Sequence, residues 1–300
     1  MTHAPASHAM NWKPVVWYLG IVFALTYGMN AWVFTQGGLS NPQVFTISAA
    51  IQMLFPAMVA IIFRQFVTKE GFKHSGLKLG KKRYYAIAFG LMLGWVVLAI
   101  GLSALTPWLT LDWGLTKVQG VMSKIAENAG KPIGLPPVAF LGAAALQAIV
   151  LGPIIGLPAL FGEEYGWRGY LLPKLLPLGT TKALVLHGVI WGLWHAPLIA
   201  MGYNYPGQPV FGILLMTAFC ILTGAIFAWL YYASGSIWVA SYAHGVLNQS
   251  VSYALALLVV SYNSLLGGTL GLIGMALLAL IVWGLARTGR LAVIGNAPLS

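Results

Sequence analysis

Ionisable and amide side chains gather in three short stretches of a chain that is otherwise strongly apolar. These stretches are 161–173, 187–195 and 241–248. Within a membrane span, each ionisable group costs about 3 kcal/mol on insertion scales. Such side chains therefore need a partner, a water-filled cavity or a chemical role, and their types favour acid–base chemistry.

The first stretch contains two adjacent glutamates that should face different surroundings. At about 100° per residue, Glu164 and Arg168 lie about 40° apart on a helix and are well placed to form an ion pair. Glu163 lies about 140° from Arg168 and has no obvious cation. One carboxylate is then neutralised by a supporting arginine, while the other is free for a separate role. Acid and base roles are commonly divided between two carboxylates in this way.

The other two stretches supply imidazole and carboxamide groups. His244 and Asn248 are four residues apart, so both point from one helix face into the same space. A second helix carries His195, and Trp191 shares its face and is predicted to wall the site. His187 lies about 80° away from the direction of His195, which predicts a packing or interfacial residue.

This set of groups is suited to the activation of water. Glu163 and His195 can take a proton from a water molecule held between them, because an imidazole titrates near neutral pH. His244 and Asn248 can donate hydrogen bonds to the oxyanion that develops when water attacks a carbonyl group. The sequence therefore predicts a hydrolase inside the membrane that cuts a peptide bond of a hydrophobic or lipid-modified substrate.

Two other chemical schemes use the same region. Glu163, His195 and His244 form a set of two histidines and one carboxylate with room for water, which is a catalytic zinc pattern. Residue types leave this scheme open, but no HExxH pair fixes two ligands on one helix, so we favour activation by glutamate without a required cofactor. A Ser or Cys nucleophile is less attractive, because Cys220 is distant in sequence and Ser241 has no assigned base.

The three motifs, in this order and with this internal spacing, resemble the CPBP family of intramembrane proteases. That family contains the Rce1 type of CAAX prenyl protease and bacterial proteins linked to bacteriocin self-immunity. The resemblance covers about 155–250 and is closest to prokaryotic members in the first motif. The matching residues are Glu163-Glu164-x-x-x-Arg168, Trp191-x-x-x-His195 and His244-x-x-x-Asn248.

The resemblance implies a role for each motif. Glu163 would activate water together with His195, and His244 and Asn248 would form the oxyanion site. The supporting residues would be Glu164 and Arg168. Position 191 departs from the family, which often has Phe there, and we expect Trp191 to reshape the pocket without removing the chemistry.

Composition defines the kind of chain that must position these groups. Apolar residues make up 59% of the 300 residues and charged residues only 7%, whereas soluble proteins have roughly 25% charged residues. This excludes a soluble enzyme, a disordered chain and a secreted disulfide scaffold. We expect an all-α, polytopic membrane helix bundle, with the single cysteine in no intramolecular disulfide.

About eight transmembrane helices are predicted, separated by Gly, Pro, Asn and basic runs. The chain divides into N-terminal helices with a basic loop (1–136), a catalytic helix core (137–260) and a C-terminal helix and tail (261–300), all within one integral membrane domain. The predicted spans are 14–36, 40–63, 84–106, 137–172 (long and interrupted), 183–201, 210–232, 237–260 and 265–286.

The distribution of Lys and Arg predicts the orientation. With eight spans, thirteen of these residues fall on the side of both termini and three on the other side, which predicts cytoplasmic termini. Rises of ~1.5 Å per residue place the polar groups at similar depth in the cytoplasmic half. The resemblance implies a prokaryotic cell membrane.

The net charge of +11 points to lipid rather than to nucleic acid. The basic segment 64–83 is predicted to be a cytoplasmic loop that contacts anionic lipid. No folded basic domain or aromatic platform surrounds these charges, so we expect no nucleic-acid partner. The expected partner is a hydrophobic, lipidated or membrane-embedded peptide.

Two further functions remain open from the sequence. A transporter or proton relay would also use Glu and His groups inside the membrane, although no internal repeat is visible. An immunity-type binding protein could keep the fold without catalysis. Loss of activity in a Glu163 variant separates the enzyme from the binding protein, and transport in proteoliposomes identifies the transporter.

Overall fold

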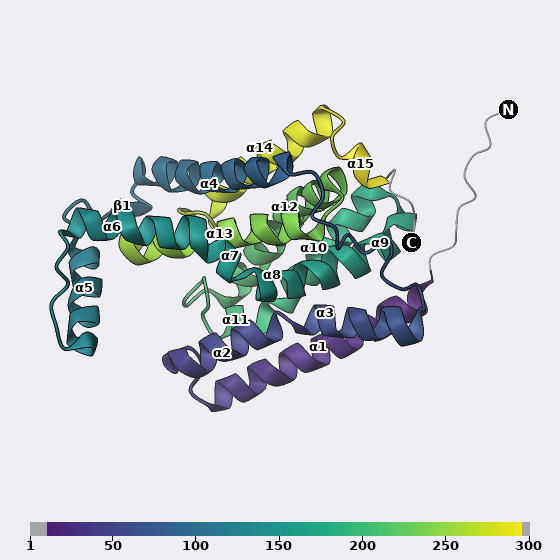
Figure 1. Ribbon diagram of the computed structural model, residues 1–300, viewed down its shortest axis with the longest axis horizontal. Coiled ribbons are helices and arrows are strands. Elements are labelled where there is room, and N and C mark those ends of the chain that lie inside the picture. Colours follow the sequence, from purple (N-terminus) through teal and green to yellow (C-terminus); the bar gives the residue numbers. More distant parts are fainter. Residues whose placement is uncertain (1–10, 296–300) are drawn as a thin grey trace.

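A computed structural model describes residues 11–295 as a bundle of helices with one small two-stranded sheet (Figure 1). The first part of the chain contains the N-terminal helices, the basic loop, the long helix α4 and, after it, β1 and α5. The elements of this part are α1 (Trp12–Thr35), η1 (Gly38–Ser40), α2 (Pro42–Gln52), α3 (Phe55–Ile62), η2 (Phe63–Val67), α4 (Arg83–Ala104), β1 (Leu109–Leu111) and α5 (Thr116–Ala129).

The remaining elements carry the three polar motifs and the C-terminal helices. They are α6 (Pro137–Ala145), η3 (Leu146–Leu151), α7 (Gly152–Ile155), α8 (Leu157–Glu164), η4 (Tyr165–Leu171), α9 (Leu172–Leu175), η5 (Leu176–Leu178), α10 (Thr180–Trp194), α11 (Ala196–Ala200), α12 (Pro209–Ser234), α13 (Ile237–Leu257), β2 (Val259–Tyr262), α14 (Leu272–Arg287) and α15 (Ala292–Gly295).

Between residues 11 and 295, five helices are long and apolar enough to cross a membrane, where the sequence predicted about eight. They are Trp12–Thr35, Pro42–Val67, Arg83–Ala104, Pro137–Ile155 and Pro209–Ser234. The other three predicted segments are also helical. However, α10 and α14 have 15 and 16 residues, and α13 is long enough but carries the polar third motif. The total of eight spans and the orientation of the termini stay predictions.

The helix Pro137–Ile155 shows why the bundle needs an apolar surrounding. Only 6% of its most apolar window is buried inside the protein, and its outward side chains include Val138, Leu146 and Ile154. An apolar surface of this kind is unfavourable in water and favourable in lipid. A helix is suited to lipid because its backbone N–H and C=O groups form hydrogen bonds within the helix itself. The protein is therefore an integral membrane helix bundle.

The segment predicted as one long and interrupted span, 137–172, is indeed interrupted. The chain breaks between α7 and α8 at Gly156, where Pro153 and Pro158 each lack a backbone N–H. Beyond the break the backbone widens into the π-helical segment η4, which the residue pattern did not predict. Widened turns of this type occur often at functional sites.

The end of the bundle near β1 and β2 contains structure that the apolar pattern did not predict. The antiparallel strands pair Leu109 with Tyr262, where the sequence predicted a helix up to residue 260 and then a loop. Beside them, the Lys117 ammonium donates to the carbonyl oxygens of Leu255 and Val259 at 2.7 and 2.8 Å and so caps α13.

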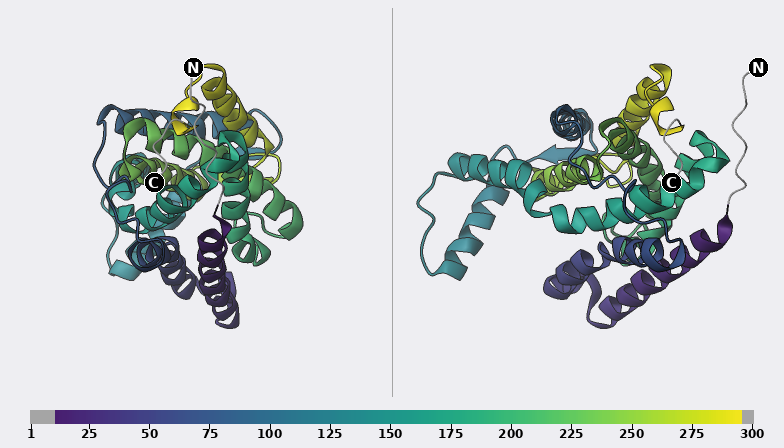
Figure 2. Two further views of the ribbon diagram at one scale, coloured as in Figure 1. Left: turned by 90° about the vertical axis from the view of Figure 1, so that its right-hand side faces the viewer. Right: turned by 45° about the vertical axis from the view of Figure 1, so that its right-hand side comes forward.

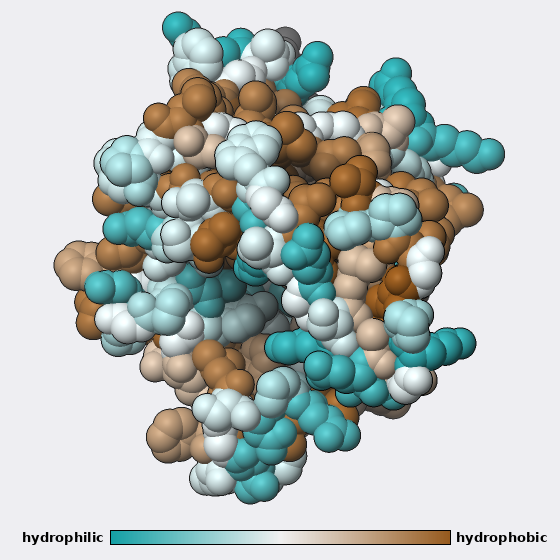
Figure 3. Space-filling view, turned by 90° about the vertical axis from the view of Figure 1, so that its left-hand side faces the viewer, coloured by the Kyte–Doolittle hydropathy of each residue, from teal (hydrophilic) through white to brown (hydrophobic). Residues whose placement is uncertain are grey.

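The same end of the bundle has an irregular surface. Figure 2 shows α5 projecting away from the bundle, and Figure 3 shows a mixed polar and apolar end face that is hollowed near its centre.

Buried Arg64 joins the basic loop after η2 to the first polar motif, through an ion pair with partly buried Glu70 and a hydrogen bond to Gly169. Arg64, 1% exposed, places Nη1 at 2.9 Å from Glu70 Oε1, and its Nη2 donates to the carbonyl oxygen of Gly169. The Lys174 ammonium lies 2.6 Å from the other Glu70 oxygen. Arg64 therefore acts inside the protein, although the sequence counted it among the cations that contact lipid.

Removal of Glu70 should destabilise the protein. In Glu70→Ala, the Arg64 guanidinium stays buried without its carboxylate, and we expect a loss of about 3 kcal/mol in the free energy of unfolding. The measurement is unfolding by a denaturing detergent, followed by Trp fluorescence. Glu127→Ala, an exposed change on α5, is the matched control and should leave stability unchanged; equal effects in both variants would refute the role of Glu70.

Candidate active site

The first motif lies in the most deeply buried part of the chain. Every residue from 162 to 172 is buried. Two glycines make this burial possible, because a Cβ on Gly162 would overlap the backbone of Met53 and Leu54, and one on Gly166 would overlap Pro56. The α8–η4 segment consequently packs directly against the junction of α2 and α3, which fixes the direction of both glutamates.

Glu164 is the neutralised carboxylate, as the four-residue spacing predicted. Its Oε1 accepts a hydrogen bond from Arg168 Nη1 at 2.9 Å, and neither side chain is exposed. The same oxygen lies 2.9 Å from His244 Nδ1 on α13. This second contact joins the first and third motifs, and the sequence did not predict it.

Glu163 has a different environment. Its Oε2 accepts a hydrogen bond from the Trp191 indole Nε1 at 2.9 Å, and within residues 11–295 it forms no ion pair. The side chain is 3% exposed. Two neighbouring carboxylates are thus held in distinct ways, one by a guanidinium and an imidazole and the other by an indole N–H.

His195 lies where a helix ends, and this differs from the continuous helix expected over 183–201. Pro197 has no N–H to donate to the carbonyl oxygen of Leu193, and α10 ends at Trp194. The Leu193 carbonyl oxygen instead accepts a hydrogen bond from the Tyr27 hydroxyl at 2.7 Å. The His195 side chain bonds back to the last turn of α10, with Nδ1 2.8 Å from the carbonyl oxygen of Trp191. This bond requires an N–H on Nδ1 and leaves Nε2 as the unprotonated nitrogen of a neutral ring.

Trp191 lies at the centre of the site. In addition to its bond to Glu163, its ring lies 5.7 Å from the ring of His195 and 5.6 Å from that of His244, measured between centroids. The guanidinium of Arg168 stacks 3.9 Å from its centroid. A single indole therefore separates and orders the groups of all three motifs, which is more than the wall predicted from sequence.

The third motif lies on one face of α13, as predicted. His244 is 6% exposed and has Phe227 beside it at 5.4 Å between ring centroids. Asn248 lies one turn further along and is half-buried, and its carboxamide makes no hydrogen bond to another described residue. The role predicted for Asn248, a donor to the oxyanion, stays a prediction.

Cys220 has a position near the site that the sequence did not reveal. Cys220 on α12 brings Sγ to 3.8 Å from His195 Nδ1, although the two are 25 positions apart in an apolar chain. The close contact of α10 with α12 depends on Gly188 and Gly192, whose Cα positions abut Ile221 and Thr217. No sequence signal marked Cys220, because any apolar residue of α12 would fit the same pattern.

His187 is a packing residue, one of the two roles predicted for it. It is fully buried behind Arg168, and its two ring nitrogens have no hydrogen-bond partner among the described residues. It contributes no contact to Glu163, His195 or His244 that the structure records.

The arrangement does not match a metal-ligand set. Between residues 11 and 295, no group of three or more His, Cys, Asp or Glu side chains is placed to hold a metal ion. Glu163 Oε2 is bonded to Trp191, and His244 Nδ1 is bonded to Glu164. The candidate ligands Glu163, His195 and His244 lie around one indole ring and do not converge on a common point.

Replacement of Trp191 should separate positioning from chemistry. Trp191→Phe keeps an aromatic ring, as in the family that the motifs resemble, but removes the donor to Glu163. A hydrogen bond to a charged group contributes about 1.5–3 kcal/mol, so we expect kcat to fall by about tenfold with KM changed less than twofold. Trp95→Phe, which removes a buried indole bond to the carbonyl oxygen of Gly274 away from the site, is the matched control. Equal losses in both variants would contradict a specific role for Trp191.

Comparisons with known proteins agree with the motifs. Residues 144–250 match the family model "Rce1-like", described as type II CAAX prenyl endopeptidase Rce1-like. A curated protein of Methanococcus maripaludis, CAAX prenyl protease 2, is 46% identical over 44 residues, which is 14% of this chain and 16% of the relative. The match thus spans about a sixth of that relative's length. Residues 144–250, which include all three motifs and every predicted site residue, are therefore similar to the Rce1-like CAAX proteases, as the sequence predicted.

Proposed function

We propose that the protein is an intramembrane endopeptidase that hydrolyses a peptide bond of a hydrophobic or lipid-modified substrate, with water activated by Glu163 and His195. The observation that carries this proposal is the division between the two glutamates. Glu164 is bound by Arg168 and His244, while Glu163 is held only by an indole. A carboxylate without a cation partner is a stronger base than one paired with a guanidinium.

The charges of the site balance when each group takes its proposed role. The proposed roles require Glu163 and Glu164 as carboxylates, Arg168 as a cation and His244 as a donor through both ring nitrogens, so that two negative and two positive charges balance. Buried charges are tolerated when they are paired and hydrogen-bonded, so this neutral set of four can persist in a dry interior. His195 is then the neutral imidazole, with Nε2 as a proton acceptor.

Hydrolysis follows from these positions. The water molecule donates a hydrogen bond to His195 and gives its other proton to Glu163. At the same time, the water oxygen attacks the carbonyl carbon of the substrate. The oxyanion that forms receives hydrogen bonds from His244 Nε2 and from the Asn248 carboxamide. The proton on Glu163 passes to the amide nitrogen and the C–N bond breaks. The products are a carboxylic acid, which keeps the second proton of the water, and an amine, and Glu163 is again a carboxylate.

His244 is oriented for this role by its bond to Glu164. With Nδ1 donating to the carboxylate at 2.9 Å, the ring is fixed and Nε2–H is available for the oxyanion. A pre-oriented donor costs no reorganisation during the reaction, which is why such donors contribute strongly to catalysis. Arg168 in turn holds Glu164, so the first motif supports the third.

The substrate class is proposed from the surroundings of the site and from the relatives. A site enclosed by apolar helices favours a substrate that partitions into lipid, and the matched family model and the relative carry the words CAAX prenyl in their descriptions. We place the protein in a prokaryotic cell membrane, with eight spans, cytoplasmic termini and the site in the cytoplasmic half. The scheme requires no metal ion, and no nucleic acid is involved.

The test is cleavage of a defined peptide by the purified protein in detergent. A quenched fluorescent peptide with a farnesylated cysteine is compared with the same peptide carrying an unmodified cysteine, with and without a strong chelator. We expect cleavage of the lipidated peptide with and without chelator, at one bond identified by mass. No cleavage of either peptide would contradict the proposal for this substrate class, and loss with chelator followed by recovery with zinc would favour the metal scheme.

A further inference from the structure

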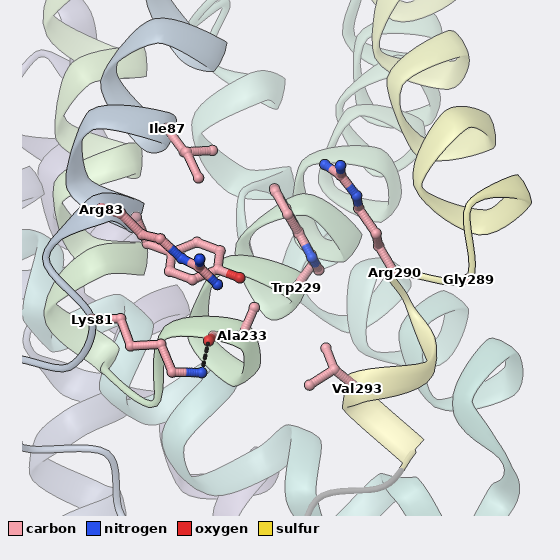
Figure 4. Close-up of a pocket in the computed structure, with 9 residues that line it drawn as sticks. Lys81, Arg83, Ile87, Trp229, Ala233, Gly289, Arg290 and Val293 are labelled. Atoms are coloured by element: carbon pink, nitrogen blue, oxygen red, sulfur yellow. Dashed lines mark hydrogen bonds between the residues drawn. The ribbon is translucent and has the colours of Figure 1, made fainter.

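A separate pocket lies at the end of the bundle where α4 begins and α12 and α14 end. It has a volume of about 520 Å³ and is open to the surroundings (Figure 4). This cationic pocket is lined by Lys81, Arg83, Tyr84, Ile87, Trp229, Ala233, Gly289, Arg290 and Val293. None of these residues belongs to the three motifs, so the proposed endopeptidase activity leaves the pocket unexplained.

The floor of the cationic pocket is aromatic and its edges are apolar. Tyr84 packs edge to face on Trp229, with 6.0 Å between ring centroids, and Trp229 is only 5% exposed. Ile87, which is 38% exposed, belongs to the outward surface of α4. Trp and Tyr rings prefer the level of lipid headgroups, where one end of the ring is apolar and the other is wet.

The walls of the cationic pocket carry three positive charges. Figure 4 shows Lys81 and Arg83 on one wall and Arg290 on the other, with Trp229 between them. The Lys81 ammonium donates a hydrogen bond to the carbonyl oxygen of Ala233 at 3.2 Å and so caps the C-terminal end of α12. The guanidinium of Arg83 lies 5.2 Å from the centroid of the Tyr84 ring.

No carboxylate within residues 11–295 neutralises these cations. The chain has five acidic residues. Glu70 is bound by Arg64 and Lys174, and Glu163 and Glu164 lie in the site. Asp112 directly follows β1 and Glu127 belongs to α5, and these two elements lie at the opposite end of the bundle (Figure 1). Two guanidinium groups and an ammonium group around one pocket therefore lack a counter-anion from the described chain.

We infer that the cationic pocket binds the phosphate group of an anionic lipid headgroup. Arginine presents its donors in a fork that matches phosphate oxygens, and two arginines on opposite walls can hold one phosphate from both sides. Basic pockets between membrane helices bind such headgroups, and a volume of this size suits a small ligand. The exposed Ile87 at the rim favours a phosphate attached to an acyl chain over a free one.

Binding would hold together three helices that meet at this end. Arg83 is the first residue of α4, Trp229 and Ala233 lie in the last two turns of α12, and Arg290 lies three residues after the end of α14. A ligand that binds the folded form alone stabilises it by mass action. Occupancy can therefore be measured as thermal stability, without any peptide substrate, so failure here and failure of the proposed protease are distinguishable.

The experiment uses full-length protein in zwitterionic detergent micelles, with phosphatidylglycerol added at increasing mole fraction and phosphatidylcholine as the neutral lipid. The double variant Arg83→Gln/Arg290→Gln is compared with Arg287→Gln. The control loses a nearby charge whose guanidinium lies over Trp283 and does not line the pocket. We expect a saturable rise in the thermal midpoint of the wild type, with half-saturation raised at least tenfold in the double variant and less than twofold in the control.

Three results would overturn the inference. They are no rise with phosphatidylglycerol in the wild type, equal losses in Arg287→Gln and the double variant, or an equal rise with soluble glycerol phosphate, which would assign the pocket to a free anion. Arg83→Lys/Arg290→Lys guards against a folding defect. It keeps the charge without the fork, and we expect it to retain a saturable rise at a half-saturation between those of the wild type and the Gln variant.

Discussion

Glu163→Gln should abolish most of the cleavage while the protein stays folded. The glutamine oxygen can still accept the hydrogen bond from Trp191 Nε1, so the packing at this position is preserved. It cannot take a proton from water, and removal of a general base typically lowers the rate by 10²–10⁴. We expect kcat for the lipidated peptide to fall by about 10³, with KM changed less than threefold.

Glu163→Asp is the companion variant. It keeps a carboxylate but withdraws it by one methylene, so the base is present at the wrong distance from water. We expect an intermediate rate, about tenfold to a hundredfold below the wild type. Full activity of Glu163→Gln in a preparation free of wild-type protein would remove this residue from catalysis.

Arg168→Gln should produce the largest loss of stability of any change in the site. The variant leaves Glu164 buried with His244 as its one remaining partner. Breaking a buried pair by removal of one member typically costs about 3–5 kcal/mol, because the other charge stays uncompensated. The measurement is the free energy of unfolding in a denaturing detergent.

A double-variant cycle identifies the cause of that loss. In Glu164→Gln/Arg168→Gln neither charge remains, so we expect the double variant to be more stable than Arg168→Gln alone. The coupling should reach about 2 kcal/mol, within the range for residues in contact. Additive losses would show that the two side chains contribute separately, contrary to the 2.9 Å contact.

Much of the site could be predicted because it depends on spacing within a helix. The four-residue separation of Glu164 and Arg168 gave the ion pair, and His244 and Asn248 share a face of α13 as expected. The apolar runs likewise predicted a helical membrane bundle. Periodicity is informative for these features because the helix geometry is local and nearly constant.

The remaining features depend on contacts between distant segments. The bond from His244 to Glu164 spans 80 positions, and the position of Cys220 beside His195 follows from packing of α10 on α12. Pro197 signalled the end of α10 in the sequence, but the apolar run around it favoured one continuous span. The short strands were missed because Val259 and Val260 fit an apolar helix as well as a sheet.

The most direct test measures two neighbours together: Glu163→Gln and Glu164→Gln, each for cleavage of the lipidated peptide and for thermal midpoint on the same preparation. We predict that Glu163→Gln keeps the wild-type midpoint and loses about 10³ in kcat. Glu164→Gln should lower the midpoint by several degrees because the buried Arg168 guanidinium loses the negative charge that compensates it. A stable, inactive Glu164→Gln together with an active Glu163→Gln would contradict this division and assign the chemistry to the other carboxylate.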